Sequence, residues 1–355
     1  MKSKQIIIIG AGLTGLTLAC LLEKEGISAT ILEARERLGG RIYTSRAKDQ
    51  APIEMGATWL GTKHKYLLNL LKDLNIDIYE QYMGKQAYYE PISTSPPQLV
   101  TLPPNDEPTY RIKGGTDNLI HTLAKQWNNS NIILNQVVES IRREKDIIHI
   151  NTTEDLFKAK IVVSTLPPKL LAENIAFTPS LPSSLDQTCR STHTWMGEAI
   201  KVGLTYRNPF WRKPGTSGTI MSNVGPIFEM YDHSNYEDTL FALKGFMNNA
   251  YHAISKTERK KLIIAQLIKF YGKQAEKFQS YQETVWKHEP YTYSKYSDSI
   301  IPHQNNGNPQ FGKPNWNGSL FIAGSETAAT YPGYMDGAVE SAIQTVKKIK
   351  ETFGS

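Results

Sequence analysis

Three glycines near the N-terminus form the pattern G-x-G-x-x-G, whose chemistry is the binding of a dinucleotide. Gly10, Gly12 and Gly15 stand between an apolar, β-branched run at 5–9 and a segment with helical character at 13–25. The first glycine permits a tight turn, the second lets the backbone approach a pyrophosphate, and the third lets helix and strand pack closely. The free N–H groups at the start of the helix then face the phosphates.

An acidic residue completes this pattern. Glu33 ends the second expected strand, at 28–33. A carboxylate in that place can accept hydrogen bonds from both hydroxyls of a ribose, and it would repel a 2′-phosphate. The alternative is a glycine turn followed by a solvated glutamate. The order of strand, glycines, helix, strand and acid favours a dinucleotide site.

The elements that must position these residues begin with a βαβ unit. Strands are expected at 5–9, 28–33, 198–206, 239–247 and 319–324, and in a strand-rich region at 131–166. Helices are expected at 13–25, over a leucine stripe at 67–74, after a turn at 114–127, from a Ser255–Glu258 capping box to Gly272, and from about 334 onward. Residues 91–108 contain six prolines, so we expect an irregular loop there.

Composition excludes several classes of protein. The chain has 355 residues, of which 40% are hydrophobic and 21% charged, so it is neither disordered nor collagen-like, and its length predicts two domains. Its two cysteines predict no disulfide framework, and its eight histidines show no metal-ligand spacing. A net charge of +6, carried in short basic runs, gives no reason to expect a nucleic-acid partner. With no signal peptide and no long apolar stretch, we expect a cytoplasmic protein without a membrane anchor.

A second motif specifies the dinucleotide. The segment LEARERLGGRIYT at 32–44 resembles the second signature of GR2-type flavoproteins. The resemblance implies that Arg35 and Arg41 approach the pyrophosphate and ribityl region of FAD, while Gly39 and Gly40 leave room for the cofactor to pass. The alternative is a charged helix cap in which these arginines pair with glutamates.

Two further segments resemble flavin amine oxidases. In IEMGATWLG at 53–61, the resemblance places Gly56, Ala57 and Thr58 beside the isoalloxazine ring. The second segment, LFIAGSETAATYPGYMDGAVESA at 320–342, matches the closing motif of the family.

In that closing motif the resemblance gives three residues a place at the cofactor. It places Gly324 and Glu326 by the ribityl chain and phosphates. The backbone N–H of Met335 would meet the flavin pyrimidine edge, where a helix begins with its positive end.

The middle of the chain resembles the substrate half of monoamine oxidases. MGEAIKVGLTYRNPFWRK at 196–213 matches the strand whose lysine contacts flavin N5 through a water, and this implies that role for Lys201. An aromatic cage for the amine is implied at Tyr296, from the segment at 286–297, and at Tyr334. The alternative is that these are ordinary core or rim tyrosines.

The same resemblance gives two more residues to the cofactor and shows two departures. Val138 matches the position whose backbone meets adenine, and Trp286 lies in the segment that carries the first cage tyrosine. Where animal monoamine oxidases attach flavin through a cysteine, this chain has Lys295, which predicts noncovalent FAD. The region 80–112 is shorter than in most of the family, so the cavity is expected to lack part of its roof.

The expected fold is α/β: a Rossmann-like FAD-binding domain of the GR2 type with a discontinuous, mixed α+β substrate-binding domain. The first would comprise 1–80, 111–172 and 286–355, and the second 81–110 and 173–285.

The expected reaction is oxidation of a primary or secondary amine to an imine. Hydride equivalents would pass from the α-carbon to flavin N5, and O2 as the expected acceptor would give H2O2. The partners would be a small amine and O2, and the chain a monomer or homodimer. Three alternatives remain: an L-amino-acid oxidase, with Arg111, Arg190 or Arg207 to bind a carboxylate; a desaturase or protoporphyrinogen-type oxidase; and a non-catalytic FAD-binding scaffold.

Overall fold

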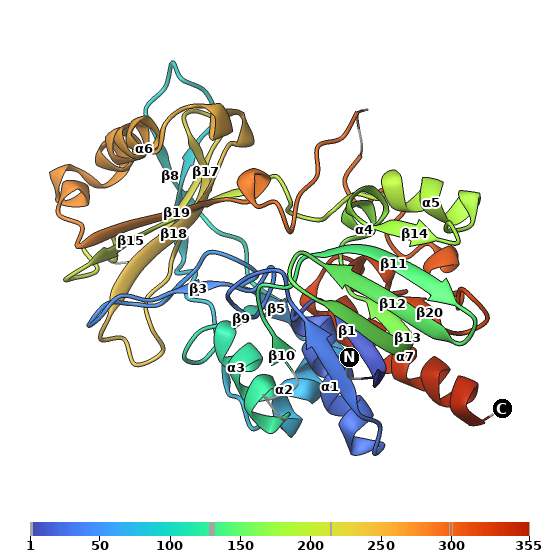
Figure 1. The fold of residues 1–355 in the computed structure, drawn as a ribbon. Coiled ribbons are helices and arrows are strands. Elements are labelled where there is room, and N and C mark those ends of the chain that lie inside the picture. The colour runs from blue at the N-terminus through green and yellow to red at the C-terminus, as the bar shows by residue number, and fades with distance from the viewer. Residues whose placement is uncertain (1–2, 128–131, 214, 298, 300, 355) are drawn as a thin grey trace.

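Two β-sheets form the two lobes of the molecule (Figure 1). The computed structural model describes residues 3–127, 132–213, 215–297, 299 and 301–354. Within this range the helices are α1 Leu13–Lys24, α2 Lys65–Asp73, α3 Asp117–Gln126, α4 Pro168–Asn174, α5 Ser183–Arg190, α6 Lys256–Tyr271 and α7 Met335–Gly354. Short 3-10 helices are η2 Asn249–Ala253, η3 Lys273–Glu276, η4 Trp286–His288, η5 Pro309–Gly312 and η6 Ser325–Thr327.

The first sheet contains the expected βαβ unit. Its strands run in the order β10-β2-β1-β13-β12-β11-β14, with β20 also paired to β13. They are β1 Ser3–Ile9, β2 Ala29–Leu32, β10 Ile132–Ile133, β11 Val138–Glu144, β12 Ile147–Thr152, β13 Leu156–Ser164, β14 Ala176–Thr178 and β20 Leu320–Ile322. β1 lies parallel between β2 and β13, and its isoleucines are buried. Such a β-branched strand, apolar on both faces, suits the centre of a parallel sheet.

Helices from both ends of the chain cover one face of this sheet. The largest apolar core joins α1, α2, α3 and α7 to the sheet. The Thr14 hydroxyl on α1 donates to the Ala338 carbonyl on α7 (3.1 Å). The glycine loop at the start of α1 and the start of α7 are therefore held together.

The second sheet forms the other lobe. Its order is β19-β15-β18-β17-β16-β7-β8, and α6 packs against one face through Ile263, Leu267 and Phe270. The strands are β7 Gln86–Glu90, β8 Gln98–Thr101, β15 Ile200–Tyr206, β16 Thr216–Ser222, β17 Ile227–Asp232, β18 Phe241–Met247 and β19 Ser280–Val285. The expected Ser255–Glu258 capping box starts α6, and Gly272 ends it with φ +78°.

Two small sheets lie in the segments that connect the lobes. They are β3 Thr44–Ser45 with β4 Ile53–Glu54, and β5 Leu60–Gly61 with β9 Thr109–Ile112 and β6 Ile78–Glu80. β4 packs closely on β15 at Gly203. A Cβ on Gly203 would lie only 2.5 Å from Ile53 Cγ2, so glycine is what permits this contact. The segment at 53–61 thus lies against the second sheet.

Two expectations from the sequence differ from the structure. Residues 91–108 are not wholly irregular, because β8 pairs antiparallel with β7. The expected boundary at 172 comes too early: β14 pairs with β11 of the first sheet, and Leu185 and Cys189 on α5 lie in a core of that sheet. β11 and β14 are more than 30 residues apart in the chain, and no local pattern in the sequence indicates that they pair. The two-domain division otherwise stays a prediction.

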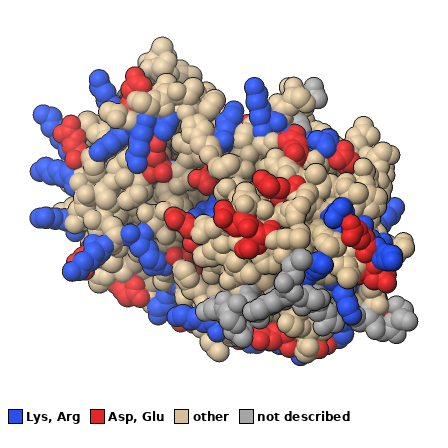
Figure 2. All heavy atoms as spheres, viewed as in Figure 1, with Lys and Arg blue, Asp and Glu red and all other residues tan. Residues whose placement is uncertain are grey.

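Charge on the visible face is mixed (Figure 2). Lys and Arg side chains spread along the edge of the lobe that holds the second sheet, and Asp and Glu side chains gather nearer the middle. No helix in the described part of the chain is long and apolar enough to span a bilayer.

Candidate active site

A cavity of about 400 Å³ lies where the two lobes meet. The glycine loop, the end of β2 and the end of β13 line it from the first lobe, and Lys201 on β15 and Phe246 on β18 line it from the second. The volume falls within the range usual for small-molecule sites.

The glycine loop forms one wall with little space to spare. Gly10 has φ +105°, a conformation that favours glycine. A Cβ on Gly15 would lie 2.0 Å from the Gly10 carbonyl oxygen, so α1 packs directly on the loop. Gly40 lies across from Gly12, and a Cβ on it would be 3.4 Å from the Gly12 Cα. The start of α1 has no side-chain cap, and Leu13 and Thr14 line the cavity there.

Glu33 is held in place by the backbone around it. The side chain is buried, and it accepts hydrogen bonds from the backbone N–H of Ala11 (2.7 Å) and of Arg35 (3.0 Å). It still lines the cavity, as do Gln136, Val137 and Val138 beside it. Two carboxylate oxygens have about four lone-pair sites, so acceptor capacity remains for a ligand.

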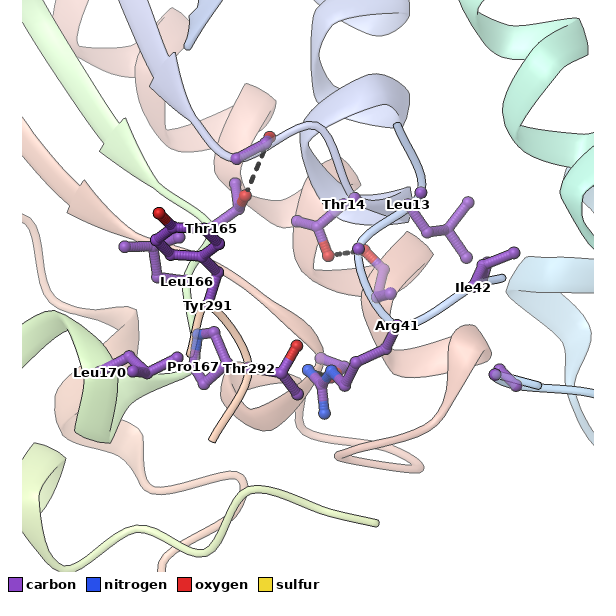
Figure 3. Close-up of a pocket in the computed structure, with 18 of the residues that line it drawn as sticks. Leu13, Thr14, Arg41, Ile42, Thr165, Leu166, Pro167, Leu170, Tyr291 and Thr292 are labelled. Atoms are coloured by element: carbon purple, nitrogen blue, oxygen red, sulfur yellow. Dashed lines mark hydrogen bonds between the residues drawn. The ribbon is translucent and has the colours of Figure 1, made fainter. Parts of the chain in front are cut away.

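The end of β13 and the loop at 291–292 close the opposite wall (Figure 3). The Thr165 hydroxyl donates to the Ile9 carbonyl (2.9 Å), which ties this wall to the glycine loop. Leu166, Pro167 and Leu170 give it an apolar surface. These residues were not among those expected at the site. The signal for them in the sequence is the strand KIVVSTL followed by two prolines, because ligands lie at the carboxyl ends of strands in open α/β sheets.

The two arginines of the second motif are both paired with protein groups. Arg35 donates to the Thr292 hydroxyl (2.9 Å) and to Glu289 (3.3 Å). Arg41 makes a bidentate pair with Glu326, at 2.6 and 2.9 Å. Burial alone would raise the pKa of Glu326, but Arg41 outweighs it and holds the pKa below its usual range. Both arginines line the cavity.

A buried network surrounds Lys201 at the other end of the cavity. Its Nζ donates to the Gly56 carbonyl, which also accepts from the Thr58 hydroxyl (3.2 Å). Thr58 in turn accepts from Nζ of Lys244 (2.9 Å), which is also buried. Burial lowers the pKa of Lys201 from 10.5 to about 8, against the opposing effects of Glu54 and Lys244.

A charged cluster lies just beyond this network. Glu54 contacts Nε2 of His233 and lies 3.8 Å from Nη2 of Arg111, and all three side chains are buried. The other Glu54 oxygen accepts from the backbone N–H of Thr116, at the start of α3 (3.1 Å). The cluster therefore joins β4, β9, α3 and the segment that follows β17.

Aromatic side chains line the cavity around Tyr334. The sequence predicts Tyr296 as the aromatic partner of Tyr334, but the ring that lines the cavity beside Tyr334 is that of Trp195. The Trp195 and Tyr334 ring centroids lie 5.8 Å apart, and both residues line the cavity. A Cβ on Gly333 would lie 2.8 Å from Cβ of Trp195, so glycine permits this contact.

Tyr296 lies behind this wall. Its hydroxyl accepts from the Thr194 backbone N–H (2.8 Å), and its ring stacks with His193 at 6.2 Å. In the described part of the chain no ring contact joins Tyr296 to Tyr334.

Most of the expected site residues meet at one cavity. Those that line it are Gly10, Gly12, Glu33, Arg35, Gly40, Arg41, Gly56, Ala57, Thr58, Val138, Lys201, Trp286, Tyr334 and Met335. Gly15, Gly324, Glu326 and Tyr296 lie outside the lining. Gly15 and Glu326 act on it through Gly10 and Arg41, as described above.

The three arginines considered for a substrate carboxylate lie elsewhere. Arg111 belongs to the Glu54 cluster, and Arg190 pairs with Asp186 (2.7 Å) and the Ala172 carbonyl (2.7 Å). Arg207 lines a separate, small pocket. None of them lines the main cavity.

A glycine loop at the end of a parallel strand, a buried lysine on a sheet and an aromatic wall meet at one cavity, an arrangement typical of oxidoreductases that bind a dinucleotide cofactor. The family model for flavin containing amine oxidoreductases matches residues 13–93 and 92–350, so the chain belongs to that family. The two matched segments meet in the β7–β8 connection, within the region expected to be short.

Similar proteins agree with this assignment. The chain is 26% identical over 453 residues to "Probable flavin-containing monoamine oxidase A" of Dictyostelium discoideum, covering 98% of this chain and 97% of the relative. A structure of putrescine oxidase bound to putrescine has a TM-score of 0.84 at 23% identity, covering 99% of both chains. Cyclohexylamine oxidase from Brevibacterium oxydans IH-35A has a TM-score of 0.86 at 20% identity, covering 100% of both chains. At these sequence identities the two structures support only the assignment of the fold.

The family assignment confirms the expected fold class, the flavin cofactor and the amine-oxidising enzyme class.

Proposed function

We propose that the chain binds FAD noncovalently and oxidises a primary or secondary monoamine to an imine. The observation that carries this proposal is one continuous cavity that reaches from Glu33 and the glycine loop to Lys201, Trp195 and Tyr334. The free cysteines, Cys20 and Cys189, are buried and do not line it, which supports a noncovalent cofactor.

The residues present fit an extended FAD. Glu33 would bind the ribose, and the backbone of Val138 would lie by the adenine. The glycine loop, the start of α1 and Arg41 would face the pyrophosphate, because free N–H groups and a guanidinium both favour an anion. A Cβ on Gly10 would lie 2.7 Å from the Thr165 hydroxyl oxygen, so this glycine keeps the loop free of a side chain where phosphates would approach.

FAD, when bound, supplies the electron acceptor for the amine carbon. The chain supplies position and electrostatics. Gly56, Ala57 and Thr58 would form the wall beside the ring, and the start of α7 at Met335 would place its positive end near it. Lys201 would orient a water and favour reoxidation by O2. An amine that binds as the free base needs no protein general base.

The lining favours a monoamine with an apolar substituent over a polyamine. The pocket end of the cavity carries Trp59, Trp195, Phe246 and Tyr334. Glu33 is the one carboxylate that lines the cavity among the described residues, and it lies at the ribose end. A second ammonium would meet Lys201 rather than an acid. The alternative reactions are those of an L-amino-acid oxidase and of a desaturase. A reducing, cytoplasmic location stays a prediction.

Anaerobic mixing with a panel of substrates tests the proposal. The panel would hold apolar monoamines, diamines, polyamines and amino acids, and bleaching of the flavin absorption band would be followed. We expect rapid bleaching by monoamines and recovery of the band on readmitting air. Bleaching by amino acids alone would favour the amino-acid oxidase, and no bleaching by any amine would contradict the proposal.

Lys201→Met is expected to slow reoxidation by O2 about 100-fold, the usual cost of removing one charge-stabilising group, with a smaller effect on reduction. Because the pKa of Lys201 is about 8, the wild-type reoxidation rate should fall as the pH rises through 8. The variant should lack this dependence. Stopped-flow mixing of the reduced enzyme with O2 measures both, and an unchanged pH profile would remove the role of Lys201.

Trp195→Ala and Tyr334→Ala are each expected to slow flavin reduction by about 10- to 100-fold, because a misplaced amine reacts slowly. Tyr296→Ala should have a smaller effect, since this ring lies behind the cavity wall. FAD content, measured for each variant, separates loss of the cofactor from loss of substrate orientation. Slow reduction in the Tyr296 variant alone would restore the pairing expected from the sequence.

A further inference from the structure

A second buried lysine lies beside Lys201. Lys244 is on β18, the neighbour of β15, and faces the same side of the sheet, since Lys201 pairs with Phe246 and Gly203 with Lys244. The two Nζ atoms lie over the same ring, at 5.0 Å (Lys201) and 4.7 Å (Lys244) from the Phe246 centroid. The side chain of Lys244 is fully buried, and its Nζ lies 3.9 Å from the Trp59 ring centroid.

The charged groups around this pair give neither lysine a counter-ion of its own. The titratable and charged groups that face it are Glu54 from β4, Arg111 from β9, Glu229 and Tyr231 from β17, and His233. Glu54 already pairs with Arg111 and His233, and Glu229 accepts from the Tyr231 hydroxyl (3.0 Å). In the described chain neither lysine has a carboxylate within ion-pair distance. Two buried ammonium groups in contact would repel each other, so one of them is expected to be neutral.

Lys244 is the more deeply buried of the two and does not line the cavity, so it is expected to be the neutral member. Burial and the neighbouring Lys201 hold the pKa of Lys244 well below 10.5. A neutral amine can donate to Thr58 and still accept a hydrogen bond through its lone pair. Lys201 lies beside it, over the same Phe246 ring and on the same network of Gly56 and Thr58. We propose that Lys244 is a positioning residue, which holds the Lys201 ammonium at the cavity wall by accepting a hydrogen bond from it.

Lys244 therefore keeps Lys201 charged at neutral pH. Only the role of the Lys201 charge in reoxidation by O2 rests on the proposed function. The pairing itself can be measured without catalysis.

Carbamylation of Lys201 by cyanate, followed by peptide mass spectrometry across pH, reports the midpoint at which this amine loses its proton. The full chain would be tested with and without FAD. The wild-type midpoint should lie near 8. In Lys244→Met it should fall by about one pH unit or more, because the ammonium loses a hydrogen-bond acceptor.

Two variants serve as comparisons. Lys244→Gln keeps an acceptor, so its midpoint should stay closer to that of the wild type, and it also serves if the Met variant does not fold. Lys260→Met removes a lysine on α6 whose Nζ also lies over an aromatic ring, 4.7 Å from the Phe278 centroid. This variant should leave the carbamylation midpoint of Lys201 unchanged. An unchanged midpoint in Lys244→Met, or a Gln midpoint as low as that of Met, would overturn the proposal.

The pH profile of reoxidation by O2 then separates the two hypotheses. If the carbamylation midpoint and the reoxidation profile both move down in Lys244→Met, both hypotheses gain support. If only the carbamylation midpoint moves, Lys244 positions Lys201, and the proposed role of Lys201 in reoxidation is wrong.

Discussion

Glu54→Ala is expected to lower the free energy of unfolding by about 3–5 kcal/mol, the usual cost of removing one partner of a buried ion pair. The variant leaves the Arg111 guanidinium buried, without the one carboxylate that the described residues place within ion-pair distance of it. Arg111 would keep the Ser234 carbonyl (2.8 Å), but its Nε already lacks a partner. Thr116 would also lose the acceptor for its backbone N–H at the start of α3.

Denaturant unfolding measures this loss. A suitable control is Glu107→Ala, because Glu107 pairs with Lys63 and both side chains are exposed. Exposed pairs add little to stability, so this variant should unfold like the wild type. If the two variants behaved alike, the cluster would not contribute to the stability of the lobe contact.

The pH dependence of the Glu54 effect has a definite sign. Although burial opposes it, the cluster lowers the pKa of Glu54 from 4.5 to about 2, so its stabilising contribution is complete above pH 4.5 and is lost as the pH falls to 2. Burial lowers the pKa of His233 from 6.5 to about 4, so protonating it also costs stability as the pH falls from 6.5 to 4. The difference between wild type and Glu54→Ala should therefore shrink below pH 4.5.

The part of the cavity proposed to hold FAD could be predicted from the sequence because its signals are local. Gly10, Gly12, Gly15 and Glu33 belong to one continuous βαβ unit, whose strand and helix periods fix where each residue lies. The closing motif at 320–342 is likewise continuous, and its β20, glycine turn and α7 follow one another in the chain.

The substrate half could not be predicted to the same extent, because its neighbours come from distant strands. Lys244 and Lys201 meet only through the register of β15 with β18. The place beside Tyr334 is filled by Trp195 because Gly333 leaves room for it, and no spacing in the sequence expresses that contact. Tyr296 has the right residue type for the cage, but tertiary packing puts it behind the wall.

Gly15→Ala is expected to destabilise the protein by about 3 kcal/mol or more and to abolish retention of FAD during purification. Helix propensity alone predicts the opposite sign, since alanine in a helix is favoured over glycine by about 1 kcal/mol. The contact decides the outcome. The added Cβ would lie 2.0 Å from the Gly10 carbonyl oxygen and 3.4 Å from Ile8 Cγ2. The nearest atom belongs to the backbone of Gly10, so no change of side-chain rotamer can relieve the clash. Overpacking of this kind costs about 1–3 kcal/mol, occasionally more.

Because α1 would have to move away from β1, the same substitution should displace the N–H groups that face the cavity. Gly61→Ala is the matched control: Gly61 has no atom within 4 Å of the position of its Cβ, so this variant should keep both its stability and its flavin. Denaturant unfolding and the ratio of flavin to protein absorbance measure the two effects. A Gly15→Ala variant that is yellow and more stable than the wild type would show that helix propensity outweighs the contact, and that the third glycine is not what holds α1 on the loop.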